Sequence, residues 1–234
     1  MRMIRDTVHG FRERPHYDEA ELDSMFERLV ADFLERKYGK ITFPICTDDL
    51  ATLIEQDVTD LDQYADLSRY GEGVEGMTEF ARAGKPKVAI SEKVHRYENR
   101  LRTTMSHEYG HVRLHAYLFA VGDRQLVLDK NRKSNAIYCM RDGMLPLGKR
   151  DWMEWQAGYA SGAVLMPKGP LTCLVGQIQE LHGIFGATSP ESAGGKDMIS
   201  AVVDGFAVSQ EAAQVRLKIL GFIGAEAAIR SLFS

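Results

Sequence analysis

Apolar residues recur every three or four positions in several stretches of the chain, a spacing that is typical of amphipathic helices. The first stretch, from Asp18 to Lys37, predicts a long helix with a buried face formed by Leu22, Met25, Phe26, Leu29, Val30, Phe33 and Leu34. A shorter helix is expected over 47–56. Three short apolar runs bounded by turn residues predict strands, at 41–45, 74–80 and 87–91.

The helical spacing continues in the second half of the chain. A helix is predicted over 99–119, with an apolar face made of Leu101, Met105, Tyr109, Val112, Ala116 and Phe119. The stretch Trp152–Leu165 is apolar nearly all round, which indicates a buried helix that ends before Pro167. Between these two helices the sequence is irregular, with short strands expected at 125–128 and 136–140. Three more helices are expected, over 171–181, 197–206 and 209–220.

Changes in composition divide the chain into four parts. The arginine-rich start, 1–16, is expected to be a flexible arm, and the Gly- and Pro-rich stretch 183–195 is expected to be a linker. They bound a main domain over 17–182 and a small helical subdomain over 196–234, whose two helices could form a helix-turn-helix. The expected fold class is α+β, with a small sheet and several helices in the main domain.

Composition and charge exclude several classes of protein. With 234 residues, 44% of them hydrophobic and 26% charged, the chain is neither disordered nor collagen-like nor a coiled coil. A formal net charge of -4 argues against nucleic acid or an anionic membrane as the main partner. Three widely spaced cysteines indicate a reducing compartment, and no run of apolar residues resembles a signal peptide or a membrane span. We therefore expect a cytoplasmic protein.

The sequence His107-Glu108-Tyr109-Gly110-His111 is a His-Glu-x-x-His motif. Residues four apart lie on the same face of a helix, so the two imidazoles can reach one metal ion. Glu108 projects beside them and can accept a proton from the water at the open metal position, then pass it to a leaving amine. The motif therefore predicts His107 and His111 as metal ligands and Glu108 as the general base and acid.

A catalytic zinc ion usually has three protein ligands and one position open to water. His115 cannot be the third, because it follows His107 by about 12 Å along a helix at about 1.5 Å per residue, too far for both to bind one ion. The metzincin spacing is also absent, since Leu114 and Tyr117 stand where it requires Gly and His. The third ligand must therefore come from another element.

Glu154 is the candidate for this third ligand. It is the carboxylate within the apolar helix predicted from Trp152 onward, where an acid needs a partner such as a cation. An alternative explanation is a capping box, with Asp151 as the N-cap and Glu154 three residues later. Both readings agree with the sequence.

Two runs of the sequence resemble a known family. Residues 100–106 leading into His107-Glu108-Tyr109-Gly110-His111-Val112-Arg113-Leu114-His115 resemble the core of the ImmA/IrrE family metallopeptidases. The run Glu154-Trp155-Gln156-Ala157-Gly158-Tyr159-Ala160, ending in Val164-Leu165-Met166-Pro167, is similar to the second helix of that family. The resemblance covers about residues 70–170, and more loosely the C-terminal turn.

The resemblance implies a thermolysin-like zincin core in which His107, His111 and Glu154 hold zinc and Glu108 activates water. Manganese is the alternative ion. It also implies an endopeptidase of narrow specificity whose protein substrate is a helix-turn-helix transcriptional repressor encoded nearby. Neither a membrane nor nucleic acid is expected as a partner of such an enzyme.

The sequence departs from the family at Gly158, where the family often has Asn or Asp four residues after the metal-binding glutamate. Such a side chain could orient a ligand histidine, so another group must do so here or the metal binds less tightly. His115 is a candidate for a residue behind the ligands, or is simply a buried histidine. The group that stabilises the oxyanion is left open among Tyr138, Tyr97 and His182.

A second function class stays open at the C-terminus. If 197–220 forms a helix-turn-helix, the chain could be a DNA-binding regulator with a metal-sensing domain. The charges of 196–234 argue against this, because the basic residues Lys196, Arg216, Lys218 and Arg230 are matched by the acidic residues Asp197, Asp204, Glu211 and Glu226. A subdomain that packs on the peptidase or binds its substrate is the alternative.

Overall fold

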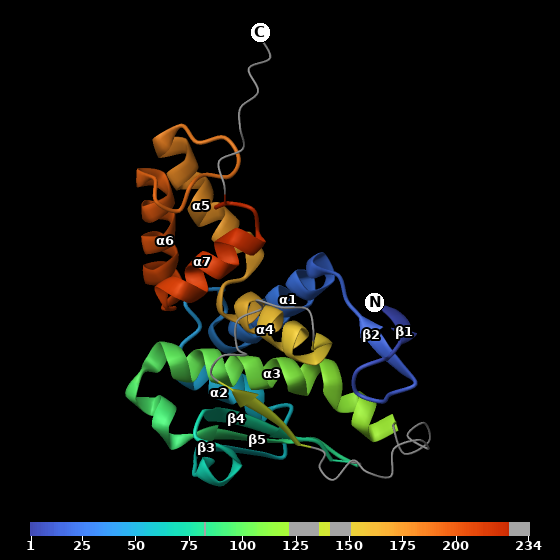
Figure 1. The fold of residues 1–234 in the computed structure, drawn as a ribbon. Helices are drawn as coiled ribbons and strands as arrows, with labels where there is room; N and C mark the ends of the chain where they lie inside the picture. The colour runs from blue at the N-terminus through green and yellow to red at the C-terminus, as the bar shows by residue number, and fades with distance from the viewer. Residues whose placement is uncertain (82, 122–135, 141–150, 225–234) are drawn as a thin grey trace. The chain divides into compact units, whose positions relative to one another are not determined.

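A computed structural model describes residues 1–81, 83–121, 136–140 and 151–224, of which 121 and 136–140 are described by their backbone alone (Figure 1). These residues form an α+β fold with seven α-helices and six strands. The chain divides into two compact units, Met1–Leu165 and Met166–Ser234, which are described separately below. Among the described residues, no helix is long and apolar enough to cross a membrane.

A small mixed sheet forms the base of the first unit. Its strands, in spatial order, are β3 (Asp60–Ala65), β5 (Lys87–Ser91), β4 (Val74–Glu79) and β6 (Ala136–Met140). β3 pairs with β5 in parallel, whereas β4 pairs antiparallel with both β5 and β6. The strands expected at 74–80, 87–91 and 136–140 are thus confirmed, while the strand expected at 125–128 lies outside the described residues. β3 was not expected from the sequence.

Four helices complete the first unit: α1 (Glu19–Tyr38), α2 (Thr47–Glu55), α3 (Glu98–Val121) and α4 (Trp152–Leu165). α3 contacts β4 and β5, and α4 contacts both α3 and α1, so α3 lies between the sheet and α4 (Figure 1). Burial on two sides explains why polar residues of α3, including its histidines, are shielded from solvent. The four helices agree with the sequence prediction to within a few residues.

The strand expected at 41–45 is wrong, because these residues form a bend before α2. Pro44 lacks an N–H group and cannot complete a strand ladder. Within this run only Ile45 is buried. Its carbonyl accepts a 2.5 Å hydrogen bond from the guanidinium of the buried Arg102. The apolar run therefore reflects a buried anchor for the loop and not a strand.

The first sixteen residues, expected to be a flexible arm, form a hairpin of β1 (Arg2–Arg5) and β2 (Glu13–His16). Asp6 at the turn of this hairpin is buried and accepts hydrogen bonds from the backbone N–H groups of residues 8, 9 and 11. It also accepts one from Nε1 of Trp152 at 3.0 Å. Phe11 contacts the rings of Phe119 and Trp152, so the hairpin packs against the ends of α3 and α4.

The second unit contains α5 (Lys168–His182), α6 (Ala193–Phe206) and α7 (Gln210–Ile219). Its boundary at Met166 lies before the expected linker at 183–195, and α6 begins inside that stretch. Gly195 is part of the first turn of α6, where a Cβ atom would stand 2.1 Å from the carbonyl oxygen of Ser189. The glycine there permits a close contact between chain segments, which composition alone does not distinguish from a flexible linker.

Candidate metal centre

α3 and α4 approach each other closely at Gly110, within the His-Glu-x-x-His motif. A Cβ atom at this position would lie 2.9 Å from the Cα atom of Ala157 and 3.0 Å from the Cβ atom of Ala160. Only glycine allows the two backbones to approach so closely without displacement. The crossing brings the first turn of α4, with Glu154, to the motif turn of α3.

Three side chains meet at this crossing. The Nε2 atoms of His107 and His111 lie 3.2 Å apart, and they lie 3.2 and 3.3 Å from the two carboxylate oxygens of Glu154. Donor atoms about 2.0–2.1 Å from a zinc ion in tetrahedral geometry lie about 3.3–3.4 Å from one another. The spacing, together with the two nitrogens and one carboxylate, therefore fits one metal ion with a fourth position open. His107, His111 and Glu154 form a triad that can hold a metal ion.

Solvent reaches this triad through the carboxylate. Both imidazoles are fully buried, whereas the Glu154 side chain is 26% exposed. Burial by itself would raise the pKa of Glu154, but hydrogen bonds and charge interactions with the two histidines outweigh it and hold this pKa far below its usual range. Burial likewise disfavours a charged His111, but the hydrogen bond that His111 donates to Glu154 and the negative charge of that carboxylate leave the pKa of His111 above its ordinary value. The carboxylate is thus ionised and ready to share a cation.

Glu108 is directed to the sheet side of α3. Its side chain is fully buried, and its Oε2 atom accepts a 2.5 Å hydrogen bond from the hydroxyl of Thr78 on β4. Gly76 on the same strand lies against the carboxylate, since a Cβ atom there would stand 2.3 Å from Oε1 of Glu108. β4 therefore holds the Glu108 carboxylate next to the triad but outside its set of donor atoms.

Tyr109 fixes the motif helix on another side. Its buried hydroxyl donates a 2.7 Å hydrogen bond to Asp57, and Arg113, one turn later, contacts the same carboxylate at 3.0 Å. Burial, followed by the hydrogen bond to Asp57, raises the pKa of Tyr109 well above its usual range. The phenol therefore stays a neutral donor that links α3 to the turn after α2.

His115 contacts His111 but lies outside the triad. Its Nδ1 atom lies 3.0 Å from Nδ1 of His111, and its Nε2 atom lies 3.0 Å from Oε1 of Gln156. The ring is fully buried, and burial and the neighbouring His111 lower the pKa of His115 well below its ordinary value. His115 is therefore a neutral imidazole behind His111.

Asp151 caps α4, as the capping-box alternative expects. One of its oxygens accepts hydrogen bonds from the backbone N–H groups of Met153 and Glu154, at 2.9 and 3.3 Å, and contacts Nε2 of His9 at 2.8 Å. The Glu154 carboxylate, however, lies with the two histidines. Capping by Asp151 and a metal-ligand position for Glu154 are thus compatible.

The residues considered for the oxyanion are placed in different parts of the molecule. Tyr138 lies on β6, paired with Met77 of β4, and its side chain is outside the described residues. Tyr97 precedes α3 and is 63% exposed. His182 ends α5 in the second unit, where it contacts Asp197 at 2.7 Å.

Sequence reasoning missed Thr78, Gly76 and Gln156. Thr78 and Gly76 belong to a strand more than 25 residues before the motif, and Gln156 is a polar residue in a helix predicted mainly from its apolar positions. Buried polar residues usually have hydrogen-bond partners. A polar residue within a predicted core element therefore indicates that it has a partner elsewhere in the chain. That signal does not identify the partner.

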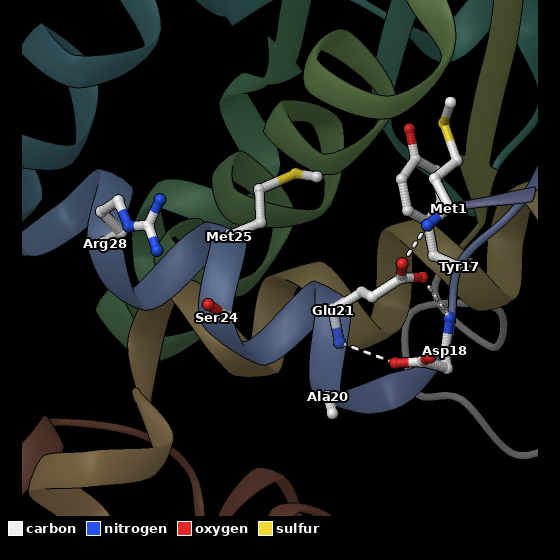
Figure 2. Close-up of a pocket in the computed structure, with 8 residues that line it drawn as sticks. All are labelled: Met1, Tyr17, Asp18, Ala20, Glu21, Ser24, Met25 and Arg28. Carbon is white, nitrogen blue, oxygen red and sulfur yellow. Dashed lines mark hydrogen bonds and ion pairs between the residues drawn. The ribbon is translucent and has the colours of Figure 1, made fainter.

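A pocket of about 650 Å³ lies elsewhere in the first unit, at the start of α1 (Figure 2). Both of its carboxylates have partners: Glu21 pairs with the amine of Met1 and completes a capping box with Asp18. None of His107, Glu108, His111 and Glu154 lines it. We therefore assign the candidate site to the α3–α4 crossing.

The close crossing gives a first expected result. Gly110→Ala places a methyl group against Ala157, and we expect it to lower the free energy of unfolding by about 1–3 kcal/mol and to weaken zinc binding, because the helices must separate. Gly176→Ala in α5, where a Cβ atom meets nothing within 4 Å, should instead stabilise the chain by about 0.5–1 kcal/mol. Thermal unfolding and zinc titration measure both effects. Unchanged zinc affinity in Gly110→Ala would contradict the role of the close approach.

No family model matches this chain, and no curated protein matches it significantly. Its function must therefore be argued from its own residues. The arrangement that carries most chemical meaning is the triad of His107, His111 and Glu154 with Glu108 beside it.

Proposed function

We propose that this chain is a zinc-dependent endopeptidase that hydrolyses a peptide bond in a specific protein substrate. The observation that carries the proposal is the convergence of His107, His111 and Glu154, with donor atoms 3.2–3.3 Å apart. Two imidazoles and a carboxylate with one open position are the donor set of several zinc peptidases. None of the three members of this triad is a cysteine, the residue that is common in a zinc site that only stabilises a fold.

In the proposed reaction, different residues of the site bind the metal and transfer the proton. His107, His111 and Glu154 would hold the ion, which when bound polarises a carbonyl group and makes water a better nucleophile near neutral pH. Glu108 would accept the proton of the attacking water and later donate it to the leaving amine. The hydrogen bond from Thr78 to Glu108 fixes the orientation of the carboxylate for both transfers.

The identity of the substrate is proposed from the resemblance to ImmA/IrrE metallopeptidases. On that basis the substrate is a helix-turn-helix repressor encoded near this chain, and cleavage relieves repression. Zinc is the preferred ion because of the donor set and its spacing, and manganese is the alternative.

Metal removal tests the proposal. The purified chain loaded with zinc should cleave the neighbouring repressor at a defined bond, a chelator should abolish cleavage, and added zinc should restore it. Gel electrophoresis and mass spectrometry identify the fragments, and a repeat with manganese compares the ions. Cleavage that survives complete metal removal, or a chain that binds no zinc at micromolar concentration, would overturn the proposal.

The alternative of a DNA-binding regulator depends on the second unit. α6 and α7 are consecutive helices with a connection at 207–209, which is the length of a helix-turn-helix turn. Arg216, however, is 2% exposed and donates a 3.1 Å hydrogen bond to the carbonyl of Met166, so it is not available to a phosphate backbone. Specific duplex binding by the full chain at moderate salt would favour this alternative.

A further inference from the structure

A continuous line of hydrogen bonds runs from His111 to the N-terminal hairpin. It passes from Nδ1 of His111 to Nδ1 of His115 at 3.0 Å, then from Nε2 of His115 to Oε1 of Gln156 at 3.0 Å. It ends where Nε2 of Gln156 donates to the carbonyl oxygen of Pro15 on β2, at 3.1 Å. The side chains of His111, His115 and Gln156 are at most 1% exposed, so water does not compete for these bonds.

The carbonyl of Pro15, at the end of this line, determines which atom donates in each of its hydrogen bonds. The Pro15 carbonyl can only accept, so the Gln156 group facing it must be the amide nitrogen, and the amide oxygen must face His115. That oxygen can only accept, so His115 carries its proton on Nε2. A neutral His115 then has a lone pair on Nδ1, and the proton between the two histidines belongs to Nδ1 of His111.

We propose that His115 and Gln156 are positioning residues that keep the proton of His111 on Nδ1, where it is donated to Nδ1 of His115. The carbonyl of Pro15 in the hairpin determines which atom of each hydrogen bond in this line is the donor. The inference rests on the proposed metal site, since a proton on Nδ1 makes Nε2 the nitrogen of His111 that binds the ion. It supplies the orienting group that Gly158 cannot.

Packing holds the His115 ring in place. Trp152 meets it edge to face, with ring centroids 5.5 Å apart and an interplanar angle of 84°. Trp152 is in turn held by the hairpin, through its hydrogen bond to Asp6 and through the guanidinium of Arg14, 5.1 Å from the ring centroid. A ring flip of His115 would break both of its hydrogen bonds. The hairpin thus contributes to the positioning of His111 although none of its residues belongs to the triad.

The tautomer of His115 tests this inference directly in the zinc-free protein. Long-range ¹H–¹⁵N spectra distinguish protonated from bare imidazole nitrogens, and we expect His115 to carry its proton on Nε2 alone. After zinc is added, His111 should carry its proton on Nδ1. A proton on Nδ1 of His115 in the folded protein would overturn the inference, and this readout depends on neither cleavage nor substrate.

Variants test the link to metal binding. Gln156→Met and His115→Leu should each weaken zinc binding about 10- to 100-fold, the cost of losing a partner of a ligand histidine. His115→Gln, which can accept from His111 and donate to Gln156, should restore much of the affinity. Ser161→Ala is the matched control, because Ser161 also joins α4 to α3, through Ser106 at 2.7 Å, but lies outside the line.

The outcomes separate the inference from the proposed function. If the wild-type chain binds zinc, and Gln156→Met binds it equally well and has the same His115 tautomer, the inference fails while the peptidase proposal stands. If the wild-type chain binds no zinc, the proposed function fails. If a variant does not fold, the tautomer of His115 in the wild-type chain still decides.

Discussion

Replacing Glu108 by Gln is expected to lower the rate of substrate cleavage by about 10²–10⁴-fold while zinc binding is retained. The amide keeps the shape of the side chain but cannot accept a proton from water. Because Glu108 lies outside the triad, the metal should stay bound. Cleavage of the proposed repressor substrate followed over time, together with zinc titration of the same variant, gives both quantities.

Glu98→Gln is the matched control for this change. Glu98 lies in the first turn of the same helix, where it accepts a 2.7 Å hydrogen bond from Thr47 at the surface. The control should cleave at the wild-type rate. A Glu108→Gln variant that cleaves as fast as the control would remove Glu108 from the mechanism.

Replacing Glu154 by Ala is expected to have the largest effect on metal binding. It removes one of the three proposed ligands, so the loss of zinc affinity should exceed the roughly 10- to 100-fold cost of losing a partner behind a ligand. Zinc at about 100 times its dissociation constant should stabilise the wild-type chain by about 2.7 kcal/mol, and this gain should vanish in the variant. Thermal unfolding with and without zinc measures the difference.

Glu55→Ala is the control for this second change, since Glu55 is an exposed acid at the end of α2 in the same unit. It should keep the full stabilisation by zinc. If Glu154→Ala were stabilised as much as Glu55→Ala, the ion would have to be held without the carboxylate, and the arrangement proposed for the site would be wrong.

The sequence was sufficient where one element carries its own pattern. The periodic apolar residues of α3 and α4 gave both helices, and the spacing of His107 and His111 placed two donors on one face of α3. Distance along the helix excludes His115 as the third donor, which must therefore come from another element. Glu154 followed from its unusual position among apolar residues.

The sequence was insufficient where a residue acts through a partner far away in the chain. Residues 1–16 look like a solvated arm because their arginines dominate the composition, yet Asp6 and Phe11 attach this segment to α4 and α3. β3 alternates exposed and partly exposed residues as an outer strand, so it lacks the apolar run on which strand prediction depends.

The same limit applies to the site. Thr78 reaches Glu108, and Gln156 reaches His115, only after the sheet and α4 have packed on opposite sides of α3. A polar residue in a core element indicates that a partner exists. Only the packed structure says which one it is.

The five consecutive residues from His107 to His111 face four different neighbours. The two histidines meet Glu154, Glu108 meets Thr78, Tyr109 meets Asp57, and Gly110 meets Ala157. The general motif leaves the positions of Tyr109 and Gly110 unspecified. In this chain they are therefore as constrained as the two histidines and the glutamate that define the motif. Substitutions should be tolerated least across these five positions. Related sequences that keep the site should therefore keep the pentapeptide as a unit.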